Sequence, residues 1–261
     1  MGGSFAAVIA ASGSSSRMSL PGGQAKKEYL PLGPAFLDRR GAPLTVLGAA
    51  VSAFAGIEDI DFIVIAVPPN GEAEARAALP EDLFAVPPAP LAPSFRFRAD
   101  PRGPRLLFVP GGSSRRISVH HALSLLEAYG PSWVLIHDGA RPWVSEALIR
   151  RVMEGVRKHS AVIPLLPLAE TPKELDGRGF IRRHLRRSAL GCAQTPQGFA
   201  FPGILRAHGQ GAERELAEAY EYTDDAELWG EFCGPVAVVP GERENRKITY
   251  PEDLVSPGVS V

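Results

Sequence analysis

Short apolar runs recur along this chain, and most are rich in Val, Ile and Leu without strict alternation of apolar and polar positions. Continuous runs of this kind are typical of strands that are covered on both faces, as in a parallel sheet. The pattern therefore predicts buried strands at residues 6–11, 61–67, 105–109, 133–137, 160–166 and 235–239.

Between these runs, apolar residues recur every three or four positions, which is the spacing of an amphipathic helix. The expected helices cover residues 44–54, 71–79, 118–129, 145–159, 213–220 and 223–232. Strand and helix in repeated alternation predict a doubly wound α/β sheet. Ligands bind such sheets beyond the C-terminal ends of the strands, so the loops after Ala11, Val109 and His137 are the expected places for chemistry.

Two segments depart from this alternation. Residues 80–104 hold a dense set of prolines, which forbid a regular helix or a central strand, so we expect an exposed insertion there. A surface loop without any role would give the same pattern. Residues 169–193 are polar, and the turn signal Asp176-Gly177-Arg178-Gly179 separates two short strand-like pieces. We expect a hairpin arm there, projecting from a single domain that spans residues 1–261.

The composition excludes several classes of function. With 45% hydrophobic residues in a chain of 261, a substantial core can be filled. The net charge of -1 gives no overall basic field, so neither nucleic acid nor a membrane surface is expected as a partner. Two cysteines without metal-ligand spacing, Cys192 and Cys233, indicate a reducing compartment. No apolar stretch approaches the roughly 18 residues of a membrane span, and we expect a cytoplasmic location.

The first candidate site follows the first apolar run. Residues 12–16 are small, and the cations Arg17, Lys26 and Lys27 come next. Backbone N–H groups and positive side chains can approach phosphates closely, so the loop predicts a triphosphate site in which Arg17 and Lys27 stabilise developing charge. Lys26 could serve in place of Lys27. The loop matches neither the GxGxxG nor the P-loop pattern, and an ordinary turn would use the same residues.

The second candidate is the sequence His137-Asp138-Gly139-Ala140-Arg141-Pro142, directly after a buried run. A carboxylate at the end of a central strand can bind a magnesium ion that phosphate oxygens also hold, and Asp138 is that carboxylate. Arg141 could hold a phosphate of a second substrate through two parallel hydrogen bonds. A salt-bridged Asp138–Arg141 pair around a turn is the alternative. We interpret His137 as a packed histidine at the strand end.

Two further loops carry weaker signals. Residues 111–118 follow a strand and precede a helix, with Ser118 as the expected N-cap and a glycine pair against which a flat base could lie. In residues 241–254, Lys247 precedes a capping pattern and would lie near a helix start, where anions collect. Glu244 could add a metal ligand. An ordinary charged loop is the alternative for this last segment.

Eight segments together suggest one family: ASGSSSRM (11–18), KKEYL (26–30), PGGSSRRISV (110–119), HDGARP (137–142), ETPK (170–173), QTPQGF (194–199), TDDA (223–226) and ENRKITYPEDL (244–254). In these segments and in their order, the chain resembles the 2-C-methyl-D-erythritol 4-phosphate cytidylyltransferases of the non-mevalonate isoprenoid pathway. The resemblance implies a three-layer, Rossmann-like α/β nucleotidyltransferase fold of the glycosyltransferase-A type. Its central sheet would be mostly parallel, with a projecting β-hairpin arm.

The reaction that this resemblance implies is attack by the phosphate of 2-C-methyl-D-erythritol 4-phosphate on the α-phosphorus of CTP, with release of pyrophosphate. Mg²⁺ is the implied cofactor, with Asp138 as its ligand, and the implied assembly is a homodimer whose arms complete the partner's site. The residues carried over are Arg17, Lys27 and Lys247 for catalysis, Ala11, Ser12, Gly13, Gly112 and Ser118 for the nucleotide, and Asp138, Arg141, Thr171, Arg187 and Thr195 for the sugar phosphate.

The sequence also departs from the family pattern. Ser113 occupies a position where the family often has aspartate, and the first loop has less glycine than usual. Ribitol 5-phosphate cytidylyltransferases share most of the motifs and are the nearest alternative, although Ala140 looks more like the methylerythritol enzymes. A non-catalytic nucleotide-binding protein is the alternative of another class, and the intact cationic residues argue against it. A dinucleotide-dependent dehydrogenase is excluded, because no glycine fingerprint follows the first strand.

Overall fold

The computed structural model describes residues 3–13, 15, 18, 26–34, 36–84, 103–218 and 220–254. Most of the expected proline-rich insertion at 80–104 lies outside these residues, and so does Arg17. Where that segment is described, Glu81–Phe84 form a short 3-10 helix, η2.

The strands are β1 (Phe5–Ala10), β2 (Ile60–Val67), β3 (Arg105–Pro110), β4 (Trp133–Asp138), β5 (Ala161–Pro167), β6 (Lys173–Leu175), β7 (Ile181–His184), β8 (Gly191–Ala193), β9 (Gln197–Ala200) and β10 (Ala237–Pro240). The helices are α1 (Val46–Ala55), α2 (Glu72–Ala77), α3 (Arg115–Glu127), α4 (Glu146–His159), α5 (Phe201–Glu218) and α6 (Asp225–Phe232), with 3-10 helices η1 (Lys27–Tyr29), η3 (Arg187–Ala189) and η4 (Pro251–Leu254). Each strand expected from an apolar run is present within two residues of its predicted bounds. Among the described helices, none combines the length and the apolar character needed to cross a membrane.

The main sheet of the described residues has eight strands in the order β10-β5-β9-β4-β1-β2-β3, with β8 paired to β5. The pairs β1–β2, β1–β4, β2–β3 and β5–β10 are parallel, whereas β9 and β8 run antiparallel to their neighbours. The predicted mostly parallel sheet is therefore confirmed. Ala10 lies opposite both Ala66 and Asp138, so the C-terminal ends of β1, β2 and β4 meet at one edge.

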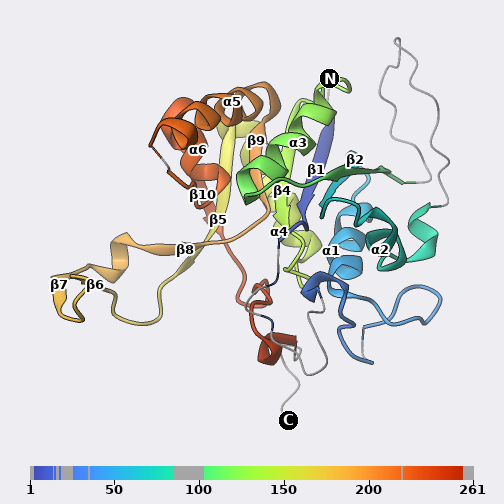
Figure 1. Cartoon of the computed structure of the whole chain (residues 1–261), viewed down its shortest axis with the longest axis horizontal. Helices are drawn as coiled ribbons and strands as arrows, with labels where there is room; N and C mark the ends of the chain where they lie inside the picture. Colours follow the sequence, from blue (N-terminus) through green and yellow to red (C-terminus); the bar gives the residue numbers. More distant parts are fainter. Residues whose placement is uncertain are drawn as a thin grey trace.

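Helices cover both faces of this sheet, which gives three layers (Figure 1). Successive side chains of a strand point to opposite faces. Ile9 of β1 therefore packs into the core on the side of α1 and α4, which buries Phe54 and Val152. Val8 packs into the core on the side of α3, α5 and α6, which buries Leu123 and Ile204. Both faces of the central strands are buried, which explains their continuous apolar sequences.

Helix α3 begins earlier than the sequence pattern predicted. Ser114 is its N-cap, because the Ser114 hydroxyl accepts a hydrogen bond from the N–H of Ile117 at 3.2 Å. The prediction of Ser118 as the N-cap is wrong: Ser118 lies inside the helix and its hydroxyl donates back to the Ser114 carbonyl at 2.8 Å. Ser114 precedes two arginines whereas Ser118 directly precedes the apolar Val119, so the apolar pattern favoured the wrong serine.

Helix α5 begins at Phe201, well before the helix that the pattern placed at residues 213–220. Glycines interrupt the apolar spacing in its first half. A Cβ on Gly203 would come within 2.6 Å of the Trp229 ring, and one on Gly211 would overlap the Leu228 side chain. These glycines therefore allow α6 to pack closely on α5, at the cost of the helical signal in the sequence.

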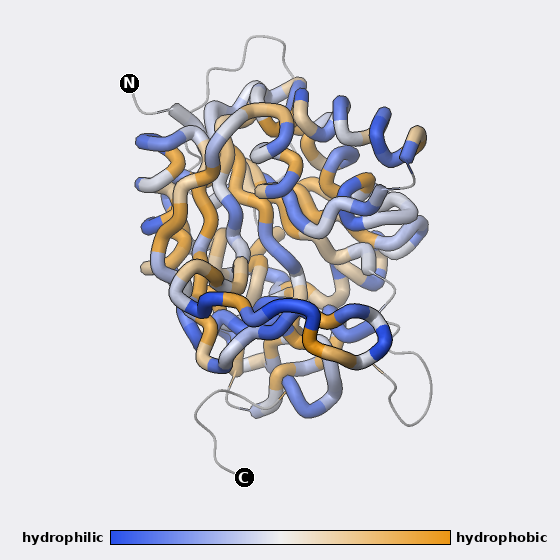
Figure 2. Tube along the Cα trace, turned by 90° about the vertical axis from the view of Figure 1, so that its left-hand side faces the viewer, coloured by the Kyte–Doolittle hydropathy of each residue, from blue (hydrophilic) through white to orange (hydrophobic). Residues whose placement is uncertain are grey.

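The arm expected at 169–193 is present, and its outer part is the antiparallel hairpin of β6 and β7. Gly177 and Gly179 have φ angles of 78° and 94°, a conformation that favours glycine, and the Asp176 carboxylate accepts the N–H groups of Arg178 and Phe180. The hairpin projects away from the main sheet (Figure 1). Figure 2, in which the arm faces the viewer, shows a mostly hydrophilic trace with separate hydrophobic positions.

Candidate active site

The loops at the C-terminal edge of the sheet surround a cavity of about 430 Å³. They are the loop after β1, the segment of η1, the loop before α3, the end of β4 and the segment after β10. Residues of the cavity wall include Ser12, Gly13, Lys27, Gly112, Asp138 and Lys247. The prediction that loops distant in sequence meet at this edge is confirmed.

One side of the cavity, which we call the slot, is lined by glycines and serines, among them Ser12, Gly13 and Gly112. The Ser118 hydroxyl accepts hydrogen bonds from the Ser12 hydroxyl at 2.7 Å and from the N–H of Gly112 at 3.0 Å. A Cβ on Gly111 would overlap Ser12, and one on Gly112 would overlap Ile117. At these two positions the loop backbone therefore packs directly against Ser12 and Ile117, which only glycine allows.

Ala11, another predicted nucleotide contact, lies at the end of β1. Its side chain is 1% exposed, and its N–H donates to the Ala66 carbonyl at 2.9 Å. Ala11 thus forms the sheet edge behind the slot.

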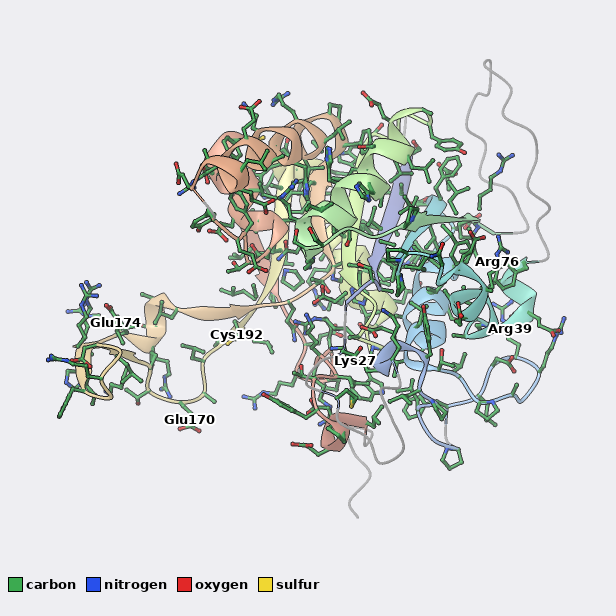
Figure 3. All side chains as sticks on the ribbon, viewed as in Figure 1. Lys27, Arg39, Arg76, Glu170, Glu174 and Cys192 are labelled. Carbon is green, nitrogen blue, oxygen red and sulfur yellow. The ribbon has the colours of Figure 1, made fainter. Side chains whose placement is uncertain are left out.

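Lys27 is nearly buried, with 9% of its surface exposed, and its Nζ donates to the Ile248 carbonyl at 2.9 Å. It lines the cavity from η1 and ties that segment to the segment after β10. Lys26 behaves differently: its Nζ donates to the Gly13 carbonyl at 2.9 Å and lies 3.9 Å from the Glu28 carboxylate. The sequence left open whether Lys26 or Lys27 faces the phosphates, and of these two lysines it is Lys27 that lines the cavity. In Figure 3 Lys27 lies below the central sheet, near the residues after β10.

Asp138 stands among three cations. Its Oδ1 lies 3.2 Å from the Arg115 guanidinium, and its Oδ2 lies 2.9 Å from Lys247 and 3.6 Å from Arg141. Burial alone would raise the pKa of Asp138, but these cations hold that pKa well below its ordinary value. The carboxylate is therefore ionised at neutral pH.

The residues around Asp138 fit a metal ion only if the ligand supplies most of the coordination. The described residues contain no group of three or more His, Cys, Asp or Glu side chains that could hold a metal. Glu244, suggested as a second ligand, is exposed and is not part of the described cavity wall. Mg²⁺ commonly binds through one carboxylate together with substrate phosphates and water. Asp138 is a carboxylate of this kind, but both of its oxygens contact cations, so Mg²⁺ would have to displace one of those contacts.

Thr195 and His137 lie behind the cavity. The Thr195 hydroxyl accepts the N–H of Asp138 at 3.1 Å and lies 3.0 Å from Nδ1 of His137. His137 is fully buried, and burial lowers its pKa to about 4, so its ring is neutral at pH 7. The interpretation of His137 as a packed histidine is confirmed. Thr195, predicted to contact the sugar phosphate, uses its hydroxyl to hold the end of β4.

Two predicted substrate residues lie on the arm, away from this cavity. Thr171 is exposed, and the exposed Arg187 donates to the Ala169 carbonyl at 2.6 Å. In Figure 3 the labelled Glu174 lies near the tip of the arm and Glu170 about midway along it, both separated from Lys27. Arg141 is closer in, because its guanidinium donates to the Asn245 carbonyl at 2.8 Å beside Asp138. Within one chain, the arm does not reach the site.

Arg115 and Asp225 have no role predicted from the sequence, although both lie in segments that carry the family resemblance. The Arg115 guanidinium bridges Asp138 and Asp225, which lies 2.7 Å from it at the start of α6. Arg115 and Asp225 are 110 positions apart, so no local spacing relates them. The membership of both residues in quoted motifs was the available signal.

These features define a class: an α/β protein whose strand-end loops enclose a cavity with glycines and serines on one side and several cations around one carboxylate. The family model described as IspD, 2-C-methyl-D-erythritol 4-phosphate cytidylyltransferase, matches residues 5–259. The chain belongs to this family.

Individual relatives agree with this assignment. A 2-C-methyl-D-erythritol 4-phosphate cytidylyltransferase from Pelotomaculum thermopropionicum is 34% identical over 249 residues, which cover 95% of this chain and 90% of that protein. A bifunctional enzyme IspD/IspF from Solidesulfovibrio magneticus is 35% identical over 250 residues, which cover 95% of this chain and 55% of that protein. The chain thus spans about half of the length of such bifunctional relatives, or less.

Among solved structures, the 4-diphosphocytidyl-2C-methyl-D-erythritol synthase of Anaerococcus prevotii is similar with a TM-score of 0.70 and 26% identity. The similarity covers 97% of this chain and 95% of that chain. The nucleotidyltransferase-like α/β fold that the motifs implied is therefore confirmed.

Proposed function

We propose that the chain transfers CMP from CTP to 2-C-methyl-D-erythritol 4-phosphate, giving 4-diphosphocytidyl-2-C-methyl-D-erythritol and pyrophosphate. Membership of the family supports this activity. The observation that carries it is that Lys27, Lys247 and Asp138 line the same cavity as Ser12, Gly13 and Gly112. Such a cavity suits a ligand with a flat base at one end and a chain of phosphates at the other.

The chemistry follows from charge. A phosphate monoester is already anionic near neutral pH, so its oxygen attacks the α-phosphorus without a general base. A new P–O bond forms there, the P–O bond to the β-phosphate breaks, and pyrophosphate leaves with the electron pair. The protein must align two anions that repel each other and neutralise charge as the bonds exchange.

The residues divide this work by position. The slot at Gly112 and Ser118 would hold cytosine, and the N–H groups of Ser12 and Gly13 would face the phosphates of CTP. Lys27, with Arg17 from the same loop, would stabilise charge on the α-phosphate and the leaving pyrophosphate. Lys247, held at 2.9 Å by Asp138, would lie between the attacking phosphate and CTP.

Mg²⁺ is the proposed cofactor, and Asp138 is the residue of this chain that would hold it, together with phosphate oxygens. When bound, the ion would supply further positive charge to the phosphates. We also propose a homodimer in which Thr171 and Arg187 of one chain face the cavity of the partner, where Arg141 would bind the sugar phosphate. A cytoplasmic location stays a prediction.

The direct test is an assay of pyrophosphate release from CTP with 2-C-methyl-D-erythritol 4-phosphate and, separately, with ribitol 5-phosphate. Release with the methylerythritol substrate and little with ribitol phosphate is expected. The family description names methylerythritol phosphate, and the ribitol alternative gains no support from it. Efficient turnover of ribitol phosphate alone, or no release with either substrate, would contradict the proposal.

A further inference from the structure

A chain of contacts runs from the buried interface of α5 and α6 to the carboxylate of Asp138. His208 Nε2 lies 3.0 Å from Asp225 Oδ1, and Asp225 Oδ2 lies 2.7 Å from the Arg115 guanidinium. The same guanidinium uses its Nε to contact Asp138 Oδ1 at 3.2 Å. Arg115 is thus held between two carboxylates, one in the cavity wall and one behind it.

The end of this series of contacts that lies away from the cavity is buried. His208 is 0% exposed and Asp225 is 1% exposed. A buried carboxylate is costly unless it is paired and hydrogen-bonded, and each oxygen of Asp225 has one of these two partners. Because the ionised carboxylate only accepts hydrogen bonds, Nε2 of His208 must carry the hydrogen.

The start of α6 does not depend on Asp225. The N-cap of α6 is the preceding residue, Asp224, whose side chain accepts the N–H of Glu227 at 2.9 Å. Helix α3 is joined to α5 by a separate ion pair, Arg116–Glu215, at 2.6 Å. The two carboxylates at 215 and 225 therefore pair with neighbouring arginines of α3, but only one of those arginines reaches the cavity.

We propose that Asp225, backed by His208, is a positioning residue that holds Arg115 so that Arg115 fixes the carboxylate of Asp138. The inference rests on the proposed cytidylyl transfer, because Asp138 and its partner Lys247 are placed there beside the reacting phosphates. With Oδ1 held by Arg115, Oδ2 keeps a fixed direction toward Lys247. Without the contact from Asp225, Asp138 and Lys247 would stay in the cavity but would be less well oriented. The rate would then fall more than the affinity for CTP.

The test compares Asp225→Asn, which keeps the shape of the side chain and removes its charge, with Glu215→Gln as the matched control. Asp225→Asn is expected to lower kcat by about tenfold or more, with KM for CTP changed by about twofold at most. Glu215→Gln breaks the neighbouring Arg116 pair and is expected to keep the wild-type kcat. Equal losses in the two variants would overturn the inference.

A double mutant separates positioning from general loss of stability. In an Arg115→Gln background, Asp225→Asn is expected to lower kcat by about twofold at most, because both changes interrupt one path. A full further loss in that background would overturn the inference. If Asp225→Asn does not fold, Arg115→Lys serves in its place, because one ammonium cannot span both carboxylates in the geometry of the guanidinium.

A readout without turnover distinguishes this inference from the proposed function. A crystal structure of Asp225→Asn is expected to show the Arg115 guanidinium outside hydrogen-bond distance of Asp138 Oδ1. An unchanged pair in that crystal would overturn the positioning role. Wild-type protein that releases no pyrophosphate would instead overturn the proposed function, while the crystal structure still decides whether Asp225 positions Arg115.

Discussion

Lys27 combines burial with a place in the cavity wall, and it gives the first prediction at the scale of single residues. Replacement by alanine is expected to lower kcat by about a hundredfold or more. Removal of a nearly buried cation deprives the transition state of several kcal/mol of electrostatic stabilisation. The measurement is pyrophosphate release from CTP under saturating substrate. The exposed Lys158 of α4 gives a control variant, Lys158→Ala, which should match wild type. A Lys27→Ala protein with the wild-type kcat would show that Lys27 does not stabilise the transition state.

Asp225 gives a prediction about pH. Burial alone would raise its pKa, but Arg115 and His208 lower that pKa below the ordinary 3.8. A carboxyl with a lower pKa in the folded state stabilises the fold above its unfolded pKa, and this stabilisation is lost as the pH falls through the folded pKa. Asp225→Asn should therefore cost about 1–3 kcal/mol in the free energy of unfolding at neutral pH, with a smaller cost in acid.

Urea unfolding of wild type and Asp225→Asn between about pH 3 and pH 7 measures this difference. The gap between the two curves should be constant at neutral pH and begin to narrow as the pH falls below 3.8. A gap that widens toward acid pH would mean that Asp225 is protonated in the folded protein.

At this scale, the sequence predicted which motif residues lie at the cavity. Lys27, Asp138 and Lys247 lie in short motifs, and the topology of a parallel sheet brings such motifs to one edge. The pairing of Arg115 with Asp225 could not be predicted in this way. It depends on how α6 docks beside α3, which no local pattern of charges specifies.

At the scale of elements, the strands were easier to predict than the helix starts. Strands buried on both faces leave long apolar runs, whereas β9 is short and contains Gly198, which lies against Val152. The N-cap at Ser114 and the start of α5 at Phe201 depend on backbone geometry and on close packing by glycine. In both places the tertiary contact overrides the local pattern.

The glycines of α5 allow a matched test of this explanation. Gly203→Ala is expected to destabilise the protein by about 1–3 kcal/mol, because its Cβ would meet the Trp229 ring at 2.6 Å. Gly209→Ala, in the same helix with nothing within 4 Å of its Cβ, should stabilise it by about 0.5–1 kcal/mol through helix propensity. Thermal unfolding of both variants decides the matter, and a stabilised Gly203→Ala protein would show that α6 is not closely packed there.

At the scale of the whole molecule, the arm exposes apolar side chains that no other part of the described chain covers. Leu175, Phe180 and Ile181 of its hairpin are 59%, 70% and 51% exposed. Exposed apolar side chains gathered on a small polar element are typical of a surface that another chain covers. Arg187 and Thr171, which the family resemblance places at the sugar phosphate, lie on this arm and outside the cavity of their own chain. A homodimer with shared sites would resolve both facts.

Shared sites make a prediction that separate sites do not. Asp138→Asn damages the cavity of a chain, and Arg187→Ala damages its arm, so each variant alone should be nearly inactive. If the arm serves the partner, a mixed dimer contains one site built from the intact cavity and the intact arm, and activity returns. If each arm serves its own cavity, both sites of the mixed dimer carry one damaged part, and activity does not return.

The two arrangements are distinguished by co-expressing the variants with two different tags, purifying the mixed dimer and measuring its pyrophosphate release. The control is a mixed dimer of Asp138→Asn and Lys27→Ala chains. Both of those changes fall in the cavity, so that pair should not recover activity. Recovery in this control would mean that any two damaged chains restore activity when they associate, so recovery would not be evidence for a shared site.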